Sequence, residues 1–160
     1  MLSTRLIQLI EVHAESLTQE VMSDILTNER TGSSARLPKA QLYPRIFSFF
    51  RNLGSWIGNP EEGSVQQEYE EFGKICRHQA IPLSEIVYTL IIIKKHLRRY
   101  IRENGLVTFS GDRVVPGELI PLELHGIQEL NYIVGDFFDR ALYYLARGYE
   151  GHTTAKHAAV

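Results

Sequence analysis

Apolar side chains recur at intervals of three and four along most of this chain, which is the spacing of one face of an α-helix. The first such stripe predicts a helix from about Ser3 to about Asn28. Polar segments rich in Gly and Pro separate it from further stripes. These predict helices over about Ala40 to Trp56, Glu61 to His78, Pro82 or Ser84 to Asn104, and Pro121 to Arg147. The pattern therefore predicts an all-α protein, an antiparallel bundle of about five helices.

The fourth of these helices is apolar on nearly every side of its middle. A chain turn at Ile81-Pro82 precedes it, because a residue before proline is biased away from helix. Its main stripe ends at Leu97 and Ile101, while its cationic side chains gather toward the C-terminal half, opposite that stripe: Lys95, Arg98, Arg99 and Arg102. We expect a central helix whose first half is enclosed and whose second half is exposed on one side.

Two interpretations are open for residues 107–117, where Gly111-Asp112 lies between two short apolar runs. The segment forms either a small β-hairpin or an irregular loop. Residues 1–150 have the length of a single helical domain. The last ten residues, 151–160, are small and polar, and we expect a flexible tail.

Composition narrows the class of protein further. The chain has 160 residues, of which 44% are hydrophobic and 22% charged, and a net charge of −2 gives no overall attraction to nucleic acid or anionic lipid. The single Cys76 excludes an internal disulfide and a cysteine-rich zinc site. The longest aliphatic run, Leu90 to Ile93, is far shorter than the roughly 20 residues that span a bilayer. We expect a soluble, cytoplasmic protein that binds neither nucleic acid nor membrane.

The catalytic and cofactor motifs that sequence can reveal are missing. There is no phosphate-binding loop, dinucleotide glycine pattern, nucleophile elbow or zinc-binding histidine pair. We therefore predict no catalytic residue, no enzyme activity and no metal site. Acidic pairs such as Glu70-Glu71 are typical of solvated helix faces. The basic run 94–102 favours a solvated face, or contact with an acidic partner surface, over a nucleic-acid patch.

Three residues are candidates for ligand binding. His13 lies on the apolar stripe of the first helix, and His96 lies one turn before Tyr100 on the fourth. A lone histidine in such a place is most often held by one hydrogen-bond partner. The alternative is a ligand site, for which His13, His96 and Tyr100 are the candidate residues. Haem would be the cofactor in that case, and otherwise no cofactor is expected.

The last helix is aromatic around much of its circumference from Tyr132 onward, including Phe137, Phe138, Tyr143 and Tyr144. One buried stripe does not require so many aromatic side chains. The surplus predicts that part of this helix contacts a second chain, a downstream domain or a ligand.

Several of these features resemble the N-terminal domain family named after the RsbT co-antagonist protein RsbRD. The matching residues are Tyr69-x-x-Phe-Gly73, Arg77-His-Gln-Ala-Ile-Pro-Leu-Ser-Glu85, the apolar helix ending in Lys94-Lys95-His-Leu97, and Asp136-Phe-Phe-Asp-Arg-Ala-Leu-Tyr-Tyr144. The resemblance covers about Leu6 to Tyr149. It rests on structural motifs rather than on a set of catalytic residues.

The resemblance implies a helical sensor domain of bacterial signal transduction and stress response. Such a domain would act by self-association, as a homodimer, and through a downstream signalling protein or domain. Non-haem globin-like input domains occur in related stressosome proteins. The alternative function is therefore a globin-like sensor that binds a small ligand or haem.

Overall fold

The computed structural model describes residues 2–32, 39–58, 61–105 and 120–151, and over these residues it contains helices and no strand. The elements are α1 (Leu2–Val12), α2 (Ala14–Thr27), the 3-10 turn η1 (Glu29–Thr31), α3 (Lys39–Arg51), α4 (Leu53–Gly58), α5 (Glu62–His78), α6 (Leu83–Gly105) and α7 (Ile120–Glu150). The predicted all-α class is confirmed. The hairpin or loop predicted at 107–117, and the tail from 152 onward, lie outside the described residues.

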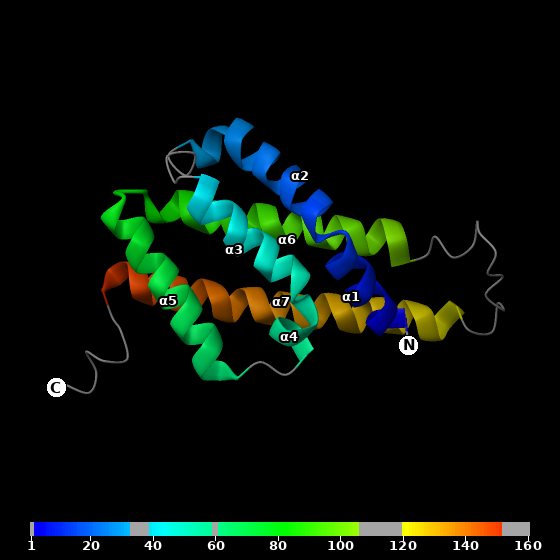
Figure 1. Cartoon of the computed structure of the whole chain (residues 1–160). Helices are drawn as coiled ribbons and strands as arrows, with labels where there is room; N and C mark the ends of the chain where they lie inside the picture. Colours follow the sequence, from blue (N-terminus) through cyan, green and yellow to red (C-terminus); the bar gives the residue numbers. More distant parts are fainter. Residues whose placement is uncertain (1, 33–38, 59–60, 106–119, 152–160) are drawn as a thin grey trace.

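The two longest helices form the frame of the molecule. Figure 1 shows α6 and α7 running lengthwise beside each other, with α1, α3 and α5 in front of them and α2 above α6. The predicted stripes meet between these layers, where the largest fully buried side chains include Phe50, Leu97, Ile101 and Phe137. Within the described parts of the chain, none of the helices combines the length and apolar character that crossing a bilayer requires.

The predicted count of five helices is wrong for the described residues, which form seven, because two of the predicted helices are each divided. The first divides at His13, whose φ of −95° and ψ of 20° depart from helical values. Hydrogen bonds from His13 N to Leu9 O and from Leu17 N to His13 O, both 3.0 Å, continue across this point. The break is therefore a kink, and the buried stripe continues across it from Ile10 through Ala14 to Leu17.

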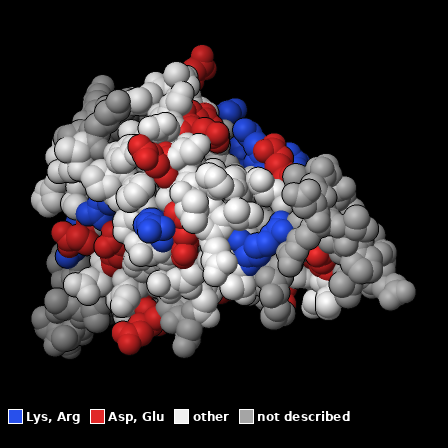
Figure 2. Space-filling model, turned by 45° about the vertical axis from the view of Figure 1, so that its right-hand side comes forward, with Lys and Arg blue, Asp and Glu red and all other residues white. Residues whose placement is uncertain are grey.

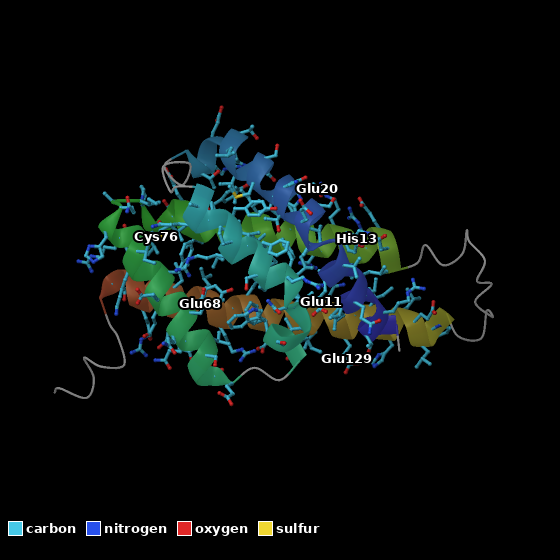
Figure 3. The ribbon with its side chains drawn as sticks, in the orientation of Figure 1. Glu11, His13, Glu20, Glu68, Cys76 and Glu129 are labelled. Atoms are coloured by element: carbon cyan, nitrogen blue, oxygen red, sulfur yellow. The ribbon has the colours of Figure 1, made fainter. Side chains whose placement is uncertain are left out.

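The second division falls at Asn52, between α3 and α4. The Asn52 side-chain amide donates to Ser48 O at 2.9 Å, as asparagine often does where a helix changes direction. The start of helix α4 is bound by a side chain of α1, because Gly54 N donates to the Glu11 carboxylate at 3.0 Å (Glu11 is labelled in Figure 3). This contact satisfies one of the amide groups that the start of a helix leaves without an internal partner.

Burial along α6 agrees with the prediction for its second half, which is exposed on one side, but not with the prediction of an enclosed first half. Ile91, in the first half, is 46% exposed, whereas Leu97 and Ile101, in the second half, are fully buried. One exposed face thus runs along the helix, and the other side is buried to its end. The reason is that α1 and α2 cover the second half of α6 on the inner side.

The closest approach of two helices joins α5 to α7 and depends on two glycines. A Cβ atom added to Gly148 would lie 2.0 Å from Glu70 O, and one added to Gly73 would lie 2.3 Å from Leu145 O. Real Cβ atoms do not approach backbone atoms so closely. Each helix therefore presents bare backbone to the other, and only glycine permits this at both positions.

The turn after α5 is tied to the end of α7. Ala80 has a positive φ of 54°, an uncommon conformation for a residue other than glycine, and the chain turns there before Pro82 as predicted. Tyr149 Oη donates to Ile81 O at 2.7 Å, and Arg77 Nη1 donates to Tyr149 O at 2.9 Å. These two bonds hold the α5–α6 turn against the last turns of α7.

We expect Gly148→Ala and Gly73→Ala each to lower the free energy of unfolding by about 2–3 kcal/mol, because the new methyl group forces two backbones apart. Urea denaturation would measure the change. Gly135→Ala is the matched control, since a Cβ there meets nothing within 4 Å. Replacing this helical glycine should stabilise the protein by about 0.5–1 kcal/mol. Equal effects at all three glycines would contradict the backbone contact.

Candidate functional site

His96 is buried, with 7% of its surface exposed, and joins α6 to α2. Its Nε2 lies 2.9 Å from Asp24 Oδ2, and its Nδ1 lies 3.9 Å from Glu20 Oε2. Nδ1 has no hydrogen-bond partner, and the Glu20 carboxylate is the acidic group that it faces. The three residues line a shallow groove of about 710 Å³ between α2 and α6. The sequence indicated His96, but not its two acidic neighbours.

The carboxylate of Asp24 is stabilised in its charged form. Burial by itself would raise the pKa of Asp24, but hydrogen bonds from His96 and Asn28, with the nearby positive charge of Lys95, lower that pKa below its ordinary value. A carboxylate so held is a fixed partner for the imidazole. The pair links two helices and gives His96 a defined orientation.

His13 and Tyr100, two of the three predicted candidates, are in contact. His13 Nδ1 lies 2.9 Å from Tyr100 Oη and 3.0 Å from Leu9 O (His13 is labelled in Figure 3). Burial raises the pKa of Tyr100, so its hydroxyl stays protonated at neutral pH. His13 itself is exposed, not buried on the apolar stripe as predicted, because the kink at this residue turns it outward. The contact fastens the α1–α2 kink to α6.

The two histidines predicted as haem candidates lie apart from the apolar cavity. His96 Nε2 is engaged by Asp24, and His13 Nδ1 is engaged by Tyr100 and Leu9. Axial ligation of haem requires a ring nitrogen aimed into an apolar cavity. Neither residue lines the apolar cavity of this protein.

That apolar cavity lies among α3, α4, α5, α6 and α7 and has a volume of about 120 Å³. Aromatic and aliphatic side chains form most of its wall, including Phe49, Trp56, Leu90 and Phe138. Drug-sized ligands occupy pockets of about 300–1,000 Å³, so this cavity suits only a much smaller molecule. No sequence pattern indicated this cavity.

The exposed face of α6 and the neighbouring part of α7 form a wide groove of about 620 Å³, here called the cationic groove. Five basic side chains line it: Lys94, Lys95, Arg98, Arg99 and Arg102. Its other lining includes Ile91 of α6 and Leu124 and Ile127 of α7. The basic run 94–102 thus borders apolar surface and is not only a solvated strip.

Helix α7 carries a second exposed surface, here called the acidic–aromatic face, defined by Glu129, Tyr132, Asp136, Asp139 and Tyr143. Tyr132 is 78% exposed and Tyr143 58% exposed, while Phe137 and Phe138 are buried. The aromatic surplus predicted for this helix is therefore real, and two tyrosines account for its exposed part. Asp136 pairs with Arg140 at 3.3 Å.

The remaining charged surface is mixed in sign. Figure 2 shows basic and acidic side chains interspersed on the face that it displays, with broad uncharged areas between them. Among the residues that the structure describes, no three His, Cys, Asp or Glu side chains are arranged to hold a metal ion. Burial raises the pKa of the Cys76 thiol to about 12, so that thiol stays protonated at neutral pH and is a poor nucleophile.

Comparison with known proteins identifies no relative: no family model, no curated protein and no solved structure matches the chain.

We expect Asp24→Asn to lower the free energy of unfolding by about 1–2 kcal/mol at pH 7, because it weakens a charge-assisted hydrogen bond to His96. The lowered pKa of Asp24 means that its carboxylate stabilises the fold above the ordinary value of 3.8, and that this contribution is lost as the pH falls through the folded-state value. The difference between variant and wild type should therefore shrink at pH 3. Urea denaturation at both pH values would measure it.

Glu15→Gln is the matched control for this prediction, since Glu15 is an exposed carboxylate on the same helix. It should change stability little at either pH. A loss in Asp24→Asn that is equally large at pH 3 and pH 7 would contradict the proposed role of the charge.

Proposed function

We propose that the chain is a regulatory domain of bacterial signal transduction in the cytoplasm, acting without catalysis through self-association and contact with a downstream signalling protein or domain. The observation that carries this proposal is the acidic–aromatic face of α7. The resemblance to the RsbRD N-terminal family favours the same class of function.

Exposed tyrosines at the centre of a helix face favour a protein contact. Tyr132 is 78% exposed and is flanked at helical spacing by Glu129 and Asp136. Tyrosine is enriched at interfaces, because it buries a large apolar ring while its hydroxyl keeps a polar contact. Two apolar residues of the same helix are also exposed: Leu122 is 66% exposed and Ile133 is 37% exposed. These side chains remain exposed among the residues that the structure describes.

The cationic groove offers a complementary surface on a second copy. It combines five positive charges with apolar lining, whereas the acidic–aromatic face combines negative charges with exposed rings. In a two-fold dimer, each copy would place its α7 face in the groove of the other, so the same contact forms twice. Both surfaces include part of α7, so the two α7 helices would lie at the centre of this dimer.

Such a dimer also provides a route for a signal. The inner side of α7 packs on α5 through Gly148, and its outer side would pack on the partner. A shift of α7 along or around its axis would therefore alter both contacts, and packed helix pairs change between discrete arrangements. In this proposal the output is a change in the α7 surface that a downstream protein contacts.

Charge reversal tests the dimer. We expect Lys94→Glu/Arg98→Glu, and separately Glu129→Lys/Asp139→Lys, to weaken self-association by about 2 kcal/mol or more, roughly 30-fold in Kd, because like charges then face each other. Light scattering coupled to gel filtration would report monomers for each variant alone. An equimolar mixture of the two variants should recover the dimer mass, because each reversed surface again meets its complement.

Glu15→Lys/Glu61→Lys is the control for charge reversal alone, since both glutamates are exposed and lie on other elements. This variant should keep the wild-type mass. A wild-type chain that stays monomeric at high concentration would remove self-association from the proposal. A dimer that survives reversal of one surface alone, in either variant, would place the interface elsewhere.

The second candidate function is small-ligand sensing, which the apolar cavity favours. Its walls come from five helices, including α7, so an occupant would touch the helix that we place at the dimer interface. Among the described residues no histidine lines the cavity, so the cavity favours a small apolar ligand over haem.

A further inference from the structure

The apolar cavity is large for a native protein interior. Interiors are packed about as densely as organic crystals, so side chains around a void lose contacts that neighbouring atoms would supply. The volume of about 120 Å³ is close to that of an engineered cavity of about 150 Å³ that stays dry and binds benzene or xenon. A molecule of that size would regain the missing contacts.

The wall of the cavity is rigid and mainly apolar. Phe49 and Phe138 meet edge to face with ring centroids 5.5 Å apart, a favoured arrangement for aromatic pairs. Both are buried, as are Leu90 and Ile93 on the α6 side. Thr89, also in the wall, donates its hydroxyl to Glu85 O at 3.0 Å. These walls favour a ligand without strong polar groups.

An ion pair lies in the solvent-facing part of the cavity wall. Arg45 of α3 and Glu68 of α5 both line the cavity and lie 2.7 Å apart (Glu68 is labelled in Figure 3). The Arg45 guanidinium also lies over the ring of Phe72, 5.1 Å from its centroid. Each charge is already balanced by the other, so a charged ligand would have to separate them. An uncharged ligand leaves the pair intact.

We propose that this cavity binds one small, uncharged, apolar molecule of about the size of benzene, in a site that five helices line beside the Arg45–Glu68 ion pair. The site itself stands on the cavity geometry, whereas its use as a signal input rests on the second candidate function. Since α3, α4, α5, α6 and α7 all contribute to the wall, occupancy stiffens the contact between α7 and the rest of the bundle.

Trp56 supplies a direct test, because it lines the cavity and is the single tryptophan of the chain. Iodobenzene, whose iodine quenches indole fluorescence on contact, would be titrated into the full chain. We expect saturable quenching of Trp56. Leu90→Phe fills part of the cavity and should weaken binding at least tenfold. Leu26→Phe, on α2, 46% exposed and outside both the cavity and the cationic groove, should leave binding unchanged.

Quenching that rises without saturation, or that is the same in folded Leu90→Phe as in the wild type, would overturn the site. A second measurement does not depend on any variant. Methyl NMR of the wild-type chain under xenon pressure should show saturable shifts at Leu42 and Ile93, which line the cavity, and not at Leu6 or Ile25, which are buried elsewhere. Shifts spread evenly over the core, or no shifts, would also overturn it.

Light scattering at saturating benzene separates this site from the proposed functions. A changed dimer fraction supports ligand sensing. Xenon shifts at the cavity with an unchanged dimer fraction keep the binding site and overturn its role as a signal input. A stable dimer without any cavity shifts overturns the site and leaves self-association in place.

Discussion

The backbone contact between α5 and α7 is the constraint on which the rest of the structure depends. Gly73 and Gly148 let the two helices touch without side chains between them, which sets where both can lie. Glu70 is buried beside this contact, where Gln66 donates to it at 3.0 Å and Arg147 lies 3.9 Å away. A buried carboxylate needs such partners, so the close approach also determines which polar groups must surround it. The cavity follows from the same geometry, because α5 and α7 form two of its walls.

A second set of polar links fixes the N-terminal helices on α6. His13 reaches Tyr100, and Asp24 reaches His96, one turn apart on the same helix. Directional bonds of this kind specify one register of α2 against α6, whereas apolar stripes tolerate sliding. The two links therefore add positional accuracy to a contact that hydrophobic burial makes stable. Neither residue pair needs a catalytic role to explain its geometry.

The sequence predicts the long elements well and their junctions poorly. The stripes place α5, α6 and α7 close to their observed bounds, because each helix buries one continuous face. They miss the kink at His13, because the stripe and the flanking hydrogen bonds continue through it. Partners such as Asp24 and Glu20 lie far from His96 in sequence, and only tertiary packing brings them together. The cavity is harder still to predict from sequence, since it depends on the space that remains between five packed helices. The family resemblance and the function remain predictions.

The bond between Glu11 and Gly54 has a consequence for the way the protein is assembled. Helix α4 is only six residues long, and its start is capped by a side chain from α1, more than forty positions earlier. Its last turns carry Trp56 into the wall of the cavity. The far N-terminal helix therefore holds one side of an internal space that it does not itself line. Any partner or modification that displaced α1 would break the bond between Glu11 and Gly54 and free α4 to move. The position of α1 therefore affects the cavity wall without any direct contact between α1 and the cavity.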